Sequence, residues 1–282
     1  MDKIIFKSEY FNPIDTLSCG QIFRYKEYKD GYLVISNDKI CYLYRDKGNT
    51  VIETEHKKYF HNFFDLDTDY EKICNLSLVM ENKTLKKSVD LGKGIRILRQ
   101  NSFETLFSFI ISQNNNVKRI SLTIEKLCEK VGKKINSPFG EYYAFPTALE
   151  LKTLTEADYK ELGFGYRGKY FISLISDIEN GFEVDGLKNL SDIDLYQSLI
   201  SLTGVGDKVA NCVMLFGFYR TKTFPVDTWI EKIYLQDYNG NLKERKKITK
   251  WFIEKYGENA GYYQQYLFYY KRSLEKLNTL KG

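Results

Sequence analysis

The spacing of apolar residues changes from a strand-like to a helical pattern near residue 100. Before it, apolar and aromatic residues are concentrated in residues 31–36, 39–45 and 50–55, with turn signals at Asn37-Asp38 and Gly48-Asn49 between them. Short runs of this kind, separated by tight turns, predict an antiparallel β-meander.

From about residue 101 onward, apolar residues recur at helical spacing. Asn101 and Glu104 have capping-box spacing ahead of an apolar run, and residues 117–131 place apolar side chains on one helical face. Thr155 and Asp158 open another helix, which ends near Gly163. Further helices are expected over residues 166–179 and 192–202, after Gly206, and over residues 227–235, 244–256 and 262–277.

These patterns predict an α+β protein that is mainly helical and carries an N-terminal antiparallel sheet. We expect an N-terminal β domain over residues 1–88 and a helical region over residues 89–282. A length of 282 residues is ample for a hydrophobic core, and we find no internal repeat or low-complexity linker.

Composition excludes several classes. The five cysteines are scattered without a CxxC pair, which argues against a disulfide framework and against zinc or iron–sulfur sites. No apolar run is long enough to span a bilayer, and the N-terminus lacks the apolar core of a signal peptide, so we expect a cytoplasmic protein. The net charge of +5 is compatible with a polyanion partner without requiring one.

The stretch LTGVGDKVANCVMLF over residues 202–216 reads as a tight turn followed by an apolar helix. Gly204 and Gly206 allow close backbone approach, and the free N–H groups at a helix N-terminus form an anion site suited to a DNA phosphate. An ordinary helix–turn–helix pairing with a glycine turn would give the same pattern.

Lys208 stands at the start of that apolar helix. The positive end of the helix dipole and apolar surroundings both favour a neutral amine, which is a nucleophile that forms Schiff bases. The alternative is a lysine that extends to solvent or pairs with a phosphate.

Nineteen residues further along the chain, Asp227 follows Pro225 and precedes a predicted helix, so it is a natural N-cap. If it converges with Lys208 on one cleft, its carboxylate can stabilise positive charge on a sugar or assist proton transfer.

The combination resembles the helix-hairpin-helix DNA glycosylase superfamily, with a hairpin at about residues 194–217 and a catalytic aspartate at Asp227. Within that resemblance, Lys208 marks the bifunctional members, and Gly204, Val205 and Gly206 would hold a DNA phosphate. Residues 20–24, 99–120, 162–170 and 260–268 further resemble the 8-oxoguanine DNA glycosylases.

Other branches of the superfamily fit less well. Endonuclease III and the adenine-removing glycosylases usually carry an iron–sulfur loop near the C-terminus, whereas no cysteine follows Cys212. Alkyl-base glycosylases lack the lysine.

The resemblance also implies how the DNA is held. A base must leave the stack before its sugar can be attacked. Asn114 would fill the gap, Arg119 and Arg167 would contact the orphaned cytosine, and Tyr166 would wedge against its neighbour. Arginine suits cytosine because N3 and O2 accept two hydrogen bonds from a guanidinium.

For the damaged base, the resemblance assigns a sensing carbonyl to Gly20, because 8-oxoguanine carries a proton on N7 where guanine has an acceptor. Gln264 would bond the base edge, Phe268 would stack on the ring, and Cys212 would form the opposite wall. Core packing is the alternative for Phe268 and Cys212, and a surface amide for Gln264.

The expected function is therefore a bifunctional DNA N-glycosylase with DNA-(apurinic or apyrimidinic site) lyase activity. It would excise 8-oxoguanine, expected opposite cytosine in double-stranded DNA, through a Lys208 Schiff base and then nick the strand by β-elimination. The alternatives are a related glycosylase for another lesion and a non-catalytic DNA-binding module, in which Lys208 only neutralises phosphate.

We expect no required cofactor and no iron–sulfur cluster, although the resemblance implies a monovalent cation at the backbone carbonyls of Ile200, Leu202 and Val205. A monomer at the nucleoid of a bacterium is expected, without a membrane partner. Trp229 departs from the histidine usual in eukaryotic members, which puts a local DNA contact in doubt. The basic stretch at residues 243–250 is expected to be a solvated helix face, and the alternative is that it faces DNA phosphates.

Overall fold

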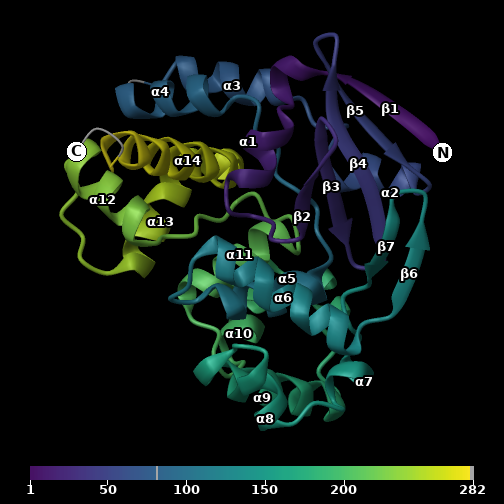
Figure 1. The fold of residues 1–282 in the computed structure, drawn as a ribbon. Coiled ribbons are helices and arrows are strands. Elements are labelled where there is room, and N and C mark those ends of the chain that lie inside the picture. The colour runs from purple at the N-terminus through teal and green to yellow at the C-terminus, as the bar shows by residue number, and fades with distance from the viewer. Residues whose placement is uncertain (81, 280–282) are drawn as a thin grey trace.

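The computed structural model describes residues 1–80 and 82–279, and its N-terminal part is a twisted antiparallel sheet (Figure 1). The strands lie in the spatial order β1-β5-β4-β3-β2. Their bounds are β1 (Asp2–Lys7), β2 (Tyr25–Tyr28), β3 (Gly31–Ser36), β4 (Lys39–Asp46) and β5 (Asn49–Thr54). The predicted meander is confirmed as β3, β4 and β5, and the sheet has an additional edge strand on each side.

Both faces of the inner strands β3, β4 and β5 are covered, and these three strands are buried on both sides for most of their length. One face packs on α1 (Pro13–Ser18) and α2 (Lys57–Phe63), and the other packs on a small hairpin of β6 (Lys134–Ser137) and β7 (Gly140–Tyr143). The hairpin was not predicted, and it is fixed by tertiary contact, because the Tyr142 hydroxyl donates to the Asp38 carbonyl at the β3–β4 turn.

The remainder of the described chain is mainly helical, and the predicted α+β fold class is confirmed. The further helices are α3 (Tyr70–Leu78), α4 (Lys83–Gly92), α5 (Ser102–Ser112), α6 (Val117–Val131), α7 (Ala148–Leu151), α8 (Glu156–Glu161), α9 (Gly168–Glu179), α10 (Asp192–Ile200), α11 (Asp207–Phe216), α12 (Thr228–Asp237), α13 (Arg245–Tyr256) and α14 (Ala260–Thr279). Short 3-10 turns lie at η1 (Ser8–Tyr10), η2 (Gly165–Arg167), η3 (Asp185–Asn189) and η4 (Gly257–Asn259).

The predicted helix caps differ in how completely they form. Thr155 and Asp158 make a full capping box at α8. Asn101 caps α5, but the Glu104 carboxylate accepts a hydrogen bond from the Asn37 backbone N–H instead of closing the box. Glu104 therefore ties α5 to the β3–β4 turn, a contact that no local pattern reveals.

Residues 21–24, which follow the turn after α1, are anchored by buried side chains. Gln21 accepts a hydrogen bond from the Leu98 N–H and donates to the Arg96 carbonyl. Arg24 donates to Glu125 on α6 and to the Tyr143 carbonyl on β7. The chain that enters the sheet is thus fixed to the helical body, directly after Gly20.

Helix α14 packs along α4 and beside α12 (Figure 1). It also returns to the beginning of the chain, because Tyr269 donates to Asp15 and Arg272 to the Ser18 carbonyl, both on α1. The predicted division between residues 88 and 89 falls inside α4, and the two-domain division stays a prediction. Among residues 1–80 and 82–279, no helix is long and apolar enough to cross a membrane.

Candidate active site

The glycine turn lies between α10 and α11, where the sequence predicted a hairpin. Gly204 has a φ of 85°, and a Cβ there would lie 2.4 Å from the Tyr170 ring. The Val205 N–H donates to the Leu202 carbonyl at 3.1 Å, which closes the turn. The turn therefore requires glycine at position 204 both for its backbone conformation and for its close contact with Tyr170.

Gly206 begins α11 without any side-chain cap, and a Cβ at this position would meet open space. The first N–H of α11 to bond back within the helix is that of Ala210, which donates to the Gly206 carbonyl. The preceding N–H groups point out of the helix end, as the anion-site prediction requires.

Lys208 is half-buried on the first turn of α11. Its ammonium lies 5.1 Å from the centre of the Phe109 ring, a cation–π contact with α5. Within the described part of the chain, no carboxylate lies within ion-pair distance of this ammonium. The amine is therefore held against an aromatic ring and stays open to the cavities beside it.

Asp227 is the N-cap of α12, as predicted. Its Oδ1 accepts hydrogen bonds from the N–H groups of Trp229 at 2.9 Å and Ile230 at 3.0 Å. Burial raises the pKa of this carboxyl above its usual 3.8, while the two hydrogen bonds and the positive charge of Lys208 act in the opposite direction. Because the cap uses Oδ1, Oδ2 is the oxygen left to act on a ligand.

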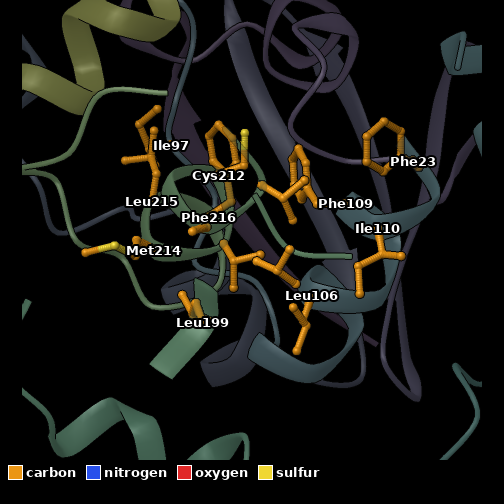
Figure 2. Packing of buried hydrophobic residues seen from close by; sticks show 14 of the residues in the cluster. Phe23, Ile97, Leu106, Phe109, Ile110, Leu199, Cys212, Met214, Leu215 and Phe216 are labelled. Carbon is orange, nitrogen blue, oxygen red and sulfur yellow. The ribbon is translucent and has the colours of Figure 1, made fainter. Parts of the chain in front are cut away.

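Lys208 and Asp227 line one small cavity of about 50 Å³ together with every residue predicted for the damaged-base pocket. Those pocket residues are Gly20, Cys212, Gln264 and Phe268. Cys212 is buried beside Phe109 and Phe216 (Figure 2). Burial raises the pKa of its thiol, and the nearby Lys208 ammonium opposes that effect.

Gln264 is buried rather than on the surface. Its Nε2 donates to the Pro225 carbonyl at 3.2 Å, and its Oε1 is buried without a hydrogen-bond partner. A buried, unpaired carbonyl oxygen is costly unless a ligand supplies the missing donor. Gln264 is one of the residues that line the small cavity, so this unpaired oxygen lies in the wall of the predicted base pocket.

A larger cleft of about 1080 Å³ contains Lys208 and Asp227 and extends over the surface around them. It is lined by the loop of residues 113–116 between α5 and α6, here called the asparagine loop, and by Gly206 of the hairpin. Trp229 and Arg245 also line it. Arg245 belongs to the stretch expected to be solvated, so part of that stretch faces the cleft instead.

The structure places the predicted DNA-wedge residues around the asparagine loop. Asn114 is exposed in a left-handed conformation with a φ of 46°, and Tyr166 is 51% exposed. Arg119 is exposed and its guanidinium reaches the Gly163 carbonyl at 3.4 Å. These side chains are accessible to a duplex.

The Arg167 side chain is not accessible, although a contact with the opposite base requires an accessible guanidinium. It is buried, and its guanidinium donates to the carbonyls of Gln113 and Asn114 and stacks against Tyr166. A buried guanidinium requires carbonyl acceptors, and here the asparagine loop supplies them. Without DNA, Arg167 therefore supports the loop, and its contact with a cytosine stays a prediction.

Sequence reasoning missed several residues of the small cavity: Cys19, Phe109, Phe216, Pro225 and Gln265. Phe109 and Phe216 belong to uniformly apolar helical runs, where a pocket position is indistinguishable from a core position. Gln265 adjoins Gln264 in sequence, and only the observed packing of α14 reveals its contacts.

Among the described residues, no group of His, Cys, Asp and Glu side chains could hold a metal ion. All five cysteines are free and buried. The small cavity is lined by an amine, a carboxyl group and the thiols of Cys19 and Cys212.

The geometry agrees with comparisons to known proteins. Residues 3–106 match the family described as 8-oxoguanine DNA glycosylase, N-terminal domain. Residues 107–258 match the HhH-GPD superfamily of base excision DNA repair proteins. The fold and the site thus define the class as a helix-hairpin-helix base-excision repair protein.

Comparisons with individual proteins give a narrower assignment within this class. An N-glycosylase/DNA lyase of Saccharomyces cerevisiae is 31% identical and covers 90% of this chain and 81% of its own length. The 8-oxoguanine glycosylase/lyase of Clostridium acetobutylicum, solved with double-stranded DNA containing cytosine opposite 8-oxoguanine, is 39% identical. That structure matches with a TM-score of 0.88 over 95% of this chain and 93% of its own.

The apo form of the clostridial protein is 40% identical over 96% of both chains, also with a TM-score of 0.88. A 3-methyladenine DNA glycosylase from Archaeoglobus fulgidus, at 18% identity, shares the fold alone. The present chain belongs to the 8-oxoguanine DNA glycosylase family of the HhH-GPD superfamily. The predicted family and the predicted enzyme class, a DNA N-glycosylase with lyase activity, are confirmed.

Proposed function

We propose that this enzyme excises 8-oxoguanine from double-stranded DNA, opposite cytosine, through a Schiff base on Lys208 and then cuts the strand by β-elimination. The observation that carries the proposal is the convergence of Lys208, Asp227 and the unpaired Gln264 oxygen on one pocket. The clostridial relative, whose structure holds 8-oxoguanine opposite cytosine, supports this choice of substrate.

The pocket chemistry suits a guanine-type base. The Watson–Crick edge of guanine carries N–H donors, and the Gln264 Oε1 is an acceptor without a partner. Phe268 offers a ring face on one side and Cys212 a small apolar wall on the other. A cavity of about 50 Å³ is smaller than a purine, so side chains of its lining must move when a base enters.

The reaction begins when the neutral Lys208 amine attacks C1′ of the extruded nucleotide. The C1′–N9 bond breaks, and its electron pair leaves with the base, which takes up a proton. The nitrogen loses one proton, and the C1′–O4′ bond then breaks; its electron pair and a proton end on O4′, which leaves a protonated Schiff base between Nζ and C1′. Removal of a proton from C2′ then expels the 3′ phosphate together with the electron pair of the C3′–O bond.

Asp227 supports both stages. Its carboxylate stabilises the positive charge that develops on the sugar, and it exchanges protons with the amine. The α12 cap holds it in place through Oδ1, so Oδ2 faces the reaction. The raised pKa brings this carboxyl closer to the proton-transfer range than that of a solvated aspartate.

The hairpin and the asparagine loop hold the duplex. The free N–H groups at the start of α11 bind a backbone phosphate without reading sequence. Asn114 fills the gap left by the extruded base, Tyr166 stacks on the opposite strand, and Arg119 contacts the cytosine. Arg167 joins Arg119 when the loop rearranges on DNA.

A monovalent cation at the hairpin carbonyls of Ile200, Leu202 and Val205 is part of the same proposal. These neutral oxygens follow the C-terminal end of α10, where the helix dipole favours a cation. Replacing potassium by a bulky organic cation at constant ionic strength should weaken DNA binding if the site is occupied.

Borohydride trapping on a duplex with 8-oxoguanine opposite cytosine tests the proposal. The wild-type enzyme should form a covalent complex, and Lys208→Gln should form none. A Lys208→Gln variant that still traps normally would show that another amine is the nucleophile. A panel of duplexes with other lesions separates this function from that of a glycosylase for a different base.

The absence of any covalent complex, with DNA binding and base release intact, would show that the reaction does not pass through a Schiff base. We further propose that the enzyme acts as a monomer on the nucleoid in a bacterial cytoplasm, and the bacterial origin of the clostridial relative supports the bacterial setting. Light scattering during gel filtration checks the oligomeric state.

A further inference from the structure

The backbone immediately before Gly20 is held by side chains from α14. The Gln265 Nε2 donates to the Cys19 carbonyl at 2.7 Å, and the Arg272 guanidinium donates to the Ser18 carbonyl at 3.0 Å. Gln265 is only 2% exposed and Cys19 is fully buried, so the first of these bonds is shielded from water. Consecutive carbonyls are therefore fixed by one helix.

The backbone immediately after Gly20 is held in the same way from another segment. The Gln100 Nε2 donates to the Gln21 carbonyl at 2.7 Å. Of the carbonyls from residue 18 to residue 21, only that of Gly20 accepts no hydrogen bond from the described residues. The unpaired Gly20 carbonyl is therefore flanked by hydrogen-bonded carbonyls, those of Ser18 and Cys19 before it and that of Gln21 after it.

Gly20 itself adopts a conformation that suits this arrangement. Its φ is 86°, and a Cβ at this position would lie 3.4 Å from the Phe268 ring and 3.7 Å from the Arg272 guanidinium. It lines both the small cavity and the larger cleft. Gly20 thus stands at the mouth of the pocket, close to residues of α14.

A fixed carbonyl has a specific physical value for this reaction. It accepts a hydrogen bond from N7–H of 8-oxoguanine and repels the N7 lone pair of guanine. A mobile carbonyl discriminates less well between the two bases. It turns away from guanine, which weakens the repulsion, and it must be ordered again when 8-oxoguanine binds, which costs free energy. Discrimination between the two bases therefore depends on what immobilises the carbonyl.

We propose that Gln265, Arg272 and Gln100 are positioning residues that immobilise the Gly20 carbonyl for lesion recognition, here called the carbonyl clamp. This inference rests on the proposed function. The clamp acts only on recognition of the base, and it does not touch the amine or the carboxyl group that break bonds.

The test compares two substrates in the same variants. Gln265→Leu and Arg272→Met keep most of the side-chain volume and remove the donor. Single-turnover excision of 8-oxoguanine should fall about tenfold in Gln265→Leu, which loses one neutral hydrogen bond, and at least as far in Arg272→Met, which loses a bond from a charged donor. Strand cutting at a preformed abasic site should fall much less than excision in both variants, because that substrate has no base for the carbonyl to read.

Matched variants sharpen the comparison. Arg272→Lys retains a donor for the Ser18 carbonyl and should recover most of the 8-oxoguanine activity lost in Arg272→Met. Lys271→Met removes a neighbouring charge that pairs with Asp237, away from the clamp, and should behave as wild type on both substrates. Because Arg272 is half-buried, Arg272→Met remains informative if Gln265→Leu fails to fold.

Equal losses on both substrates would overturn the proposal, because they would indicate a general structural defect. Unchanged 8-oxoguanine excision in Arg272→Met would overturn it as well. Failure of the proposed function has a different signature, since the wild-type enzyme would then release no 8-oxoguanine and trap on neither substrate.

Discussion

Gln113 donates a hydrogen bond of 2.8 Å from its side-chain amide to the carbonyl of Gly204. This bond joins the asparagine loop to the hairpin turn, although the two segments are far apart in sequence. The carbonyl of Gln113 in turn accepts hydrogen bonds from Arg167. The proposed phosphate contact and the proposed gap-filling contact are therefore held at a fixed distance from each other.

Gln113→Leu should loosen this connection without altering any charge. We expect a loss of about 1 kcal/mol in DNA binding, close to the net value of a hydrogen bond, because the loop and the turn must then be ordered separately. The dependence of affinity on salt should stay the same, since no ionic contact is removed. Fluorescence anisotropy over a salt series measures both quantities, and a changed slope would argue against this reading.

Asp227→Asn should raise thermal stability at neutral pH while lowering excision at least about a hundredfold. Asparagine is an equally good N-cap, and it carries no buried charge. The carboxyl has a raised pKa in the folded state, so its ionised form costs stability at neutral pH.

The sign of the pH dependence follows from that raised pKa. As the pH falls through the folded-state pKa toward the usual 3.8, Asp227 becomes protonated and its cost disappears. The difference in Tm between Asp227→Asn and wild type should therefore be largest at neutral pH and vanish near pH 4. Scanning calorimetry at several pH values checks this, and a variant less stable than wild type at pH 7 would contradict it.

Gly204→Ala and Gly206→Ala form a matched pair within one turn. A Cβ at position 204 meets the Tyr170 ring at 2.4 Å in a left-handed conformation, so the first change should cost about 2 kcal/mol or more. A Cβ at position 206 meets open space, so the second change should leave Tm within a few degrees and weaken DNA binding instead. Equal Tm values for the two variants would contradict the observed packing.

Arg245→Met should weaken binding to DNA of any sequence and reduce the slope of log affinity against log salt by about 1. Arg245 lines the large cleft and is oriented by Glu231, to which it donates at 2.8 and 3.0 Å. Lys247→Met is the control, because Lys247 pairs with Glu244 and is absent from the cleft lining. If the slope for Lys247→Met falls as far as that for Arg245→Met, the effect comes from the overall positive charge of the protein rather than from a contact in the cleft.

Local sequence patterns predict those elements that are determined by residues close together in the chain. The strands β3 to β5, the bounds of α6 and the Asp227 cap follow from periodicity, turn residues and capping. The convergence of Gly20, Cys212, Gln264 and Phe268 followed from the family resemblance, since each side chain alone reads as core or surface.

Other features depend on contacts between distant segments, and the sequence does not express them. Glu104 has capping-box spacing, yet its carboxylate accepts a hydrogen bond from the Asn37 N–H in the β3–β4 turn. Arg167 looks like a surface arginine until the carbonyls of the asparagine loop surround it. The hydrogen bonds of Gln265 and Arg272 depend on where α14 docks, which no short window of residues determines.

The docking of α14 also sets an order of events during synthesis. Lys208 and Asp227 emerge from the ribosome before Gln264 and Phe268, which lie on the last described helix. A nascent chain that ends before α14 can hold the amine and the carboxyl group, but it has no wall against which to recognise a base. If Gln264 and Phe268 recognise the base as proposed, selectivity for damage is acquired only when the C-terminal helix packs against the first helix of the chain.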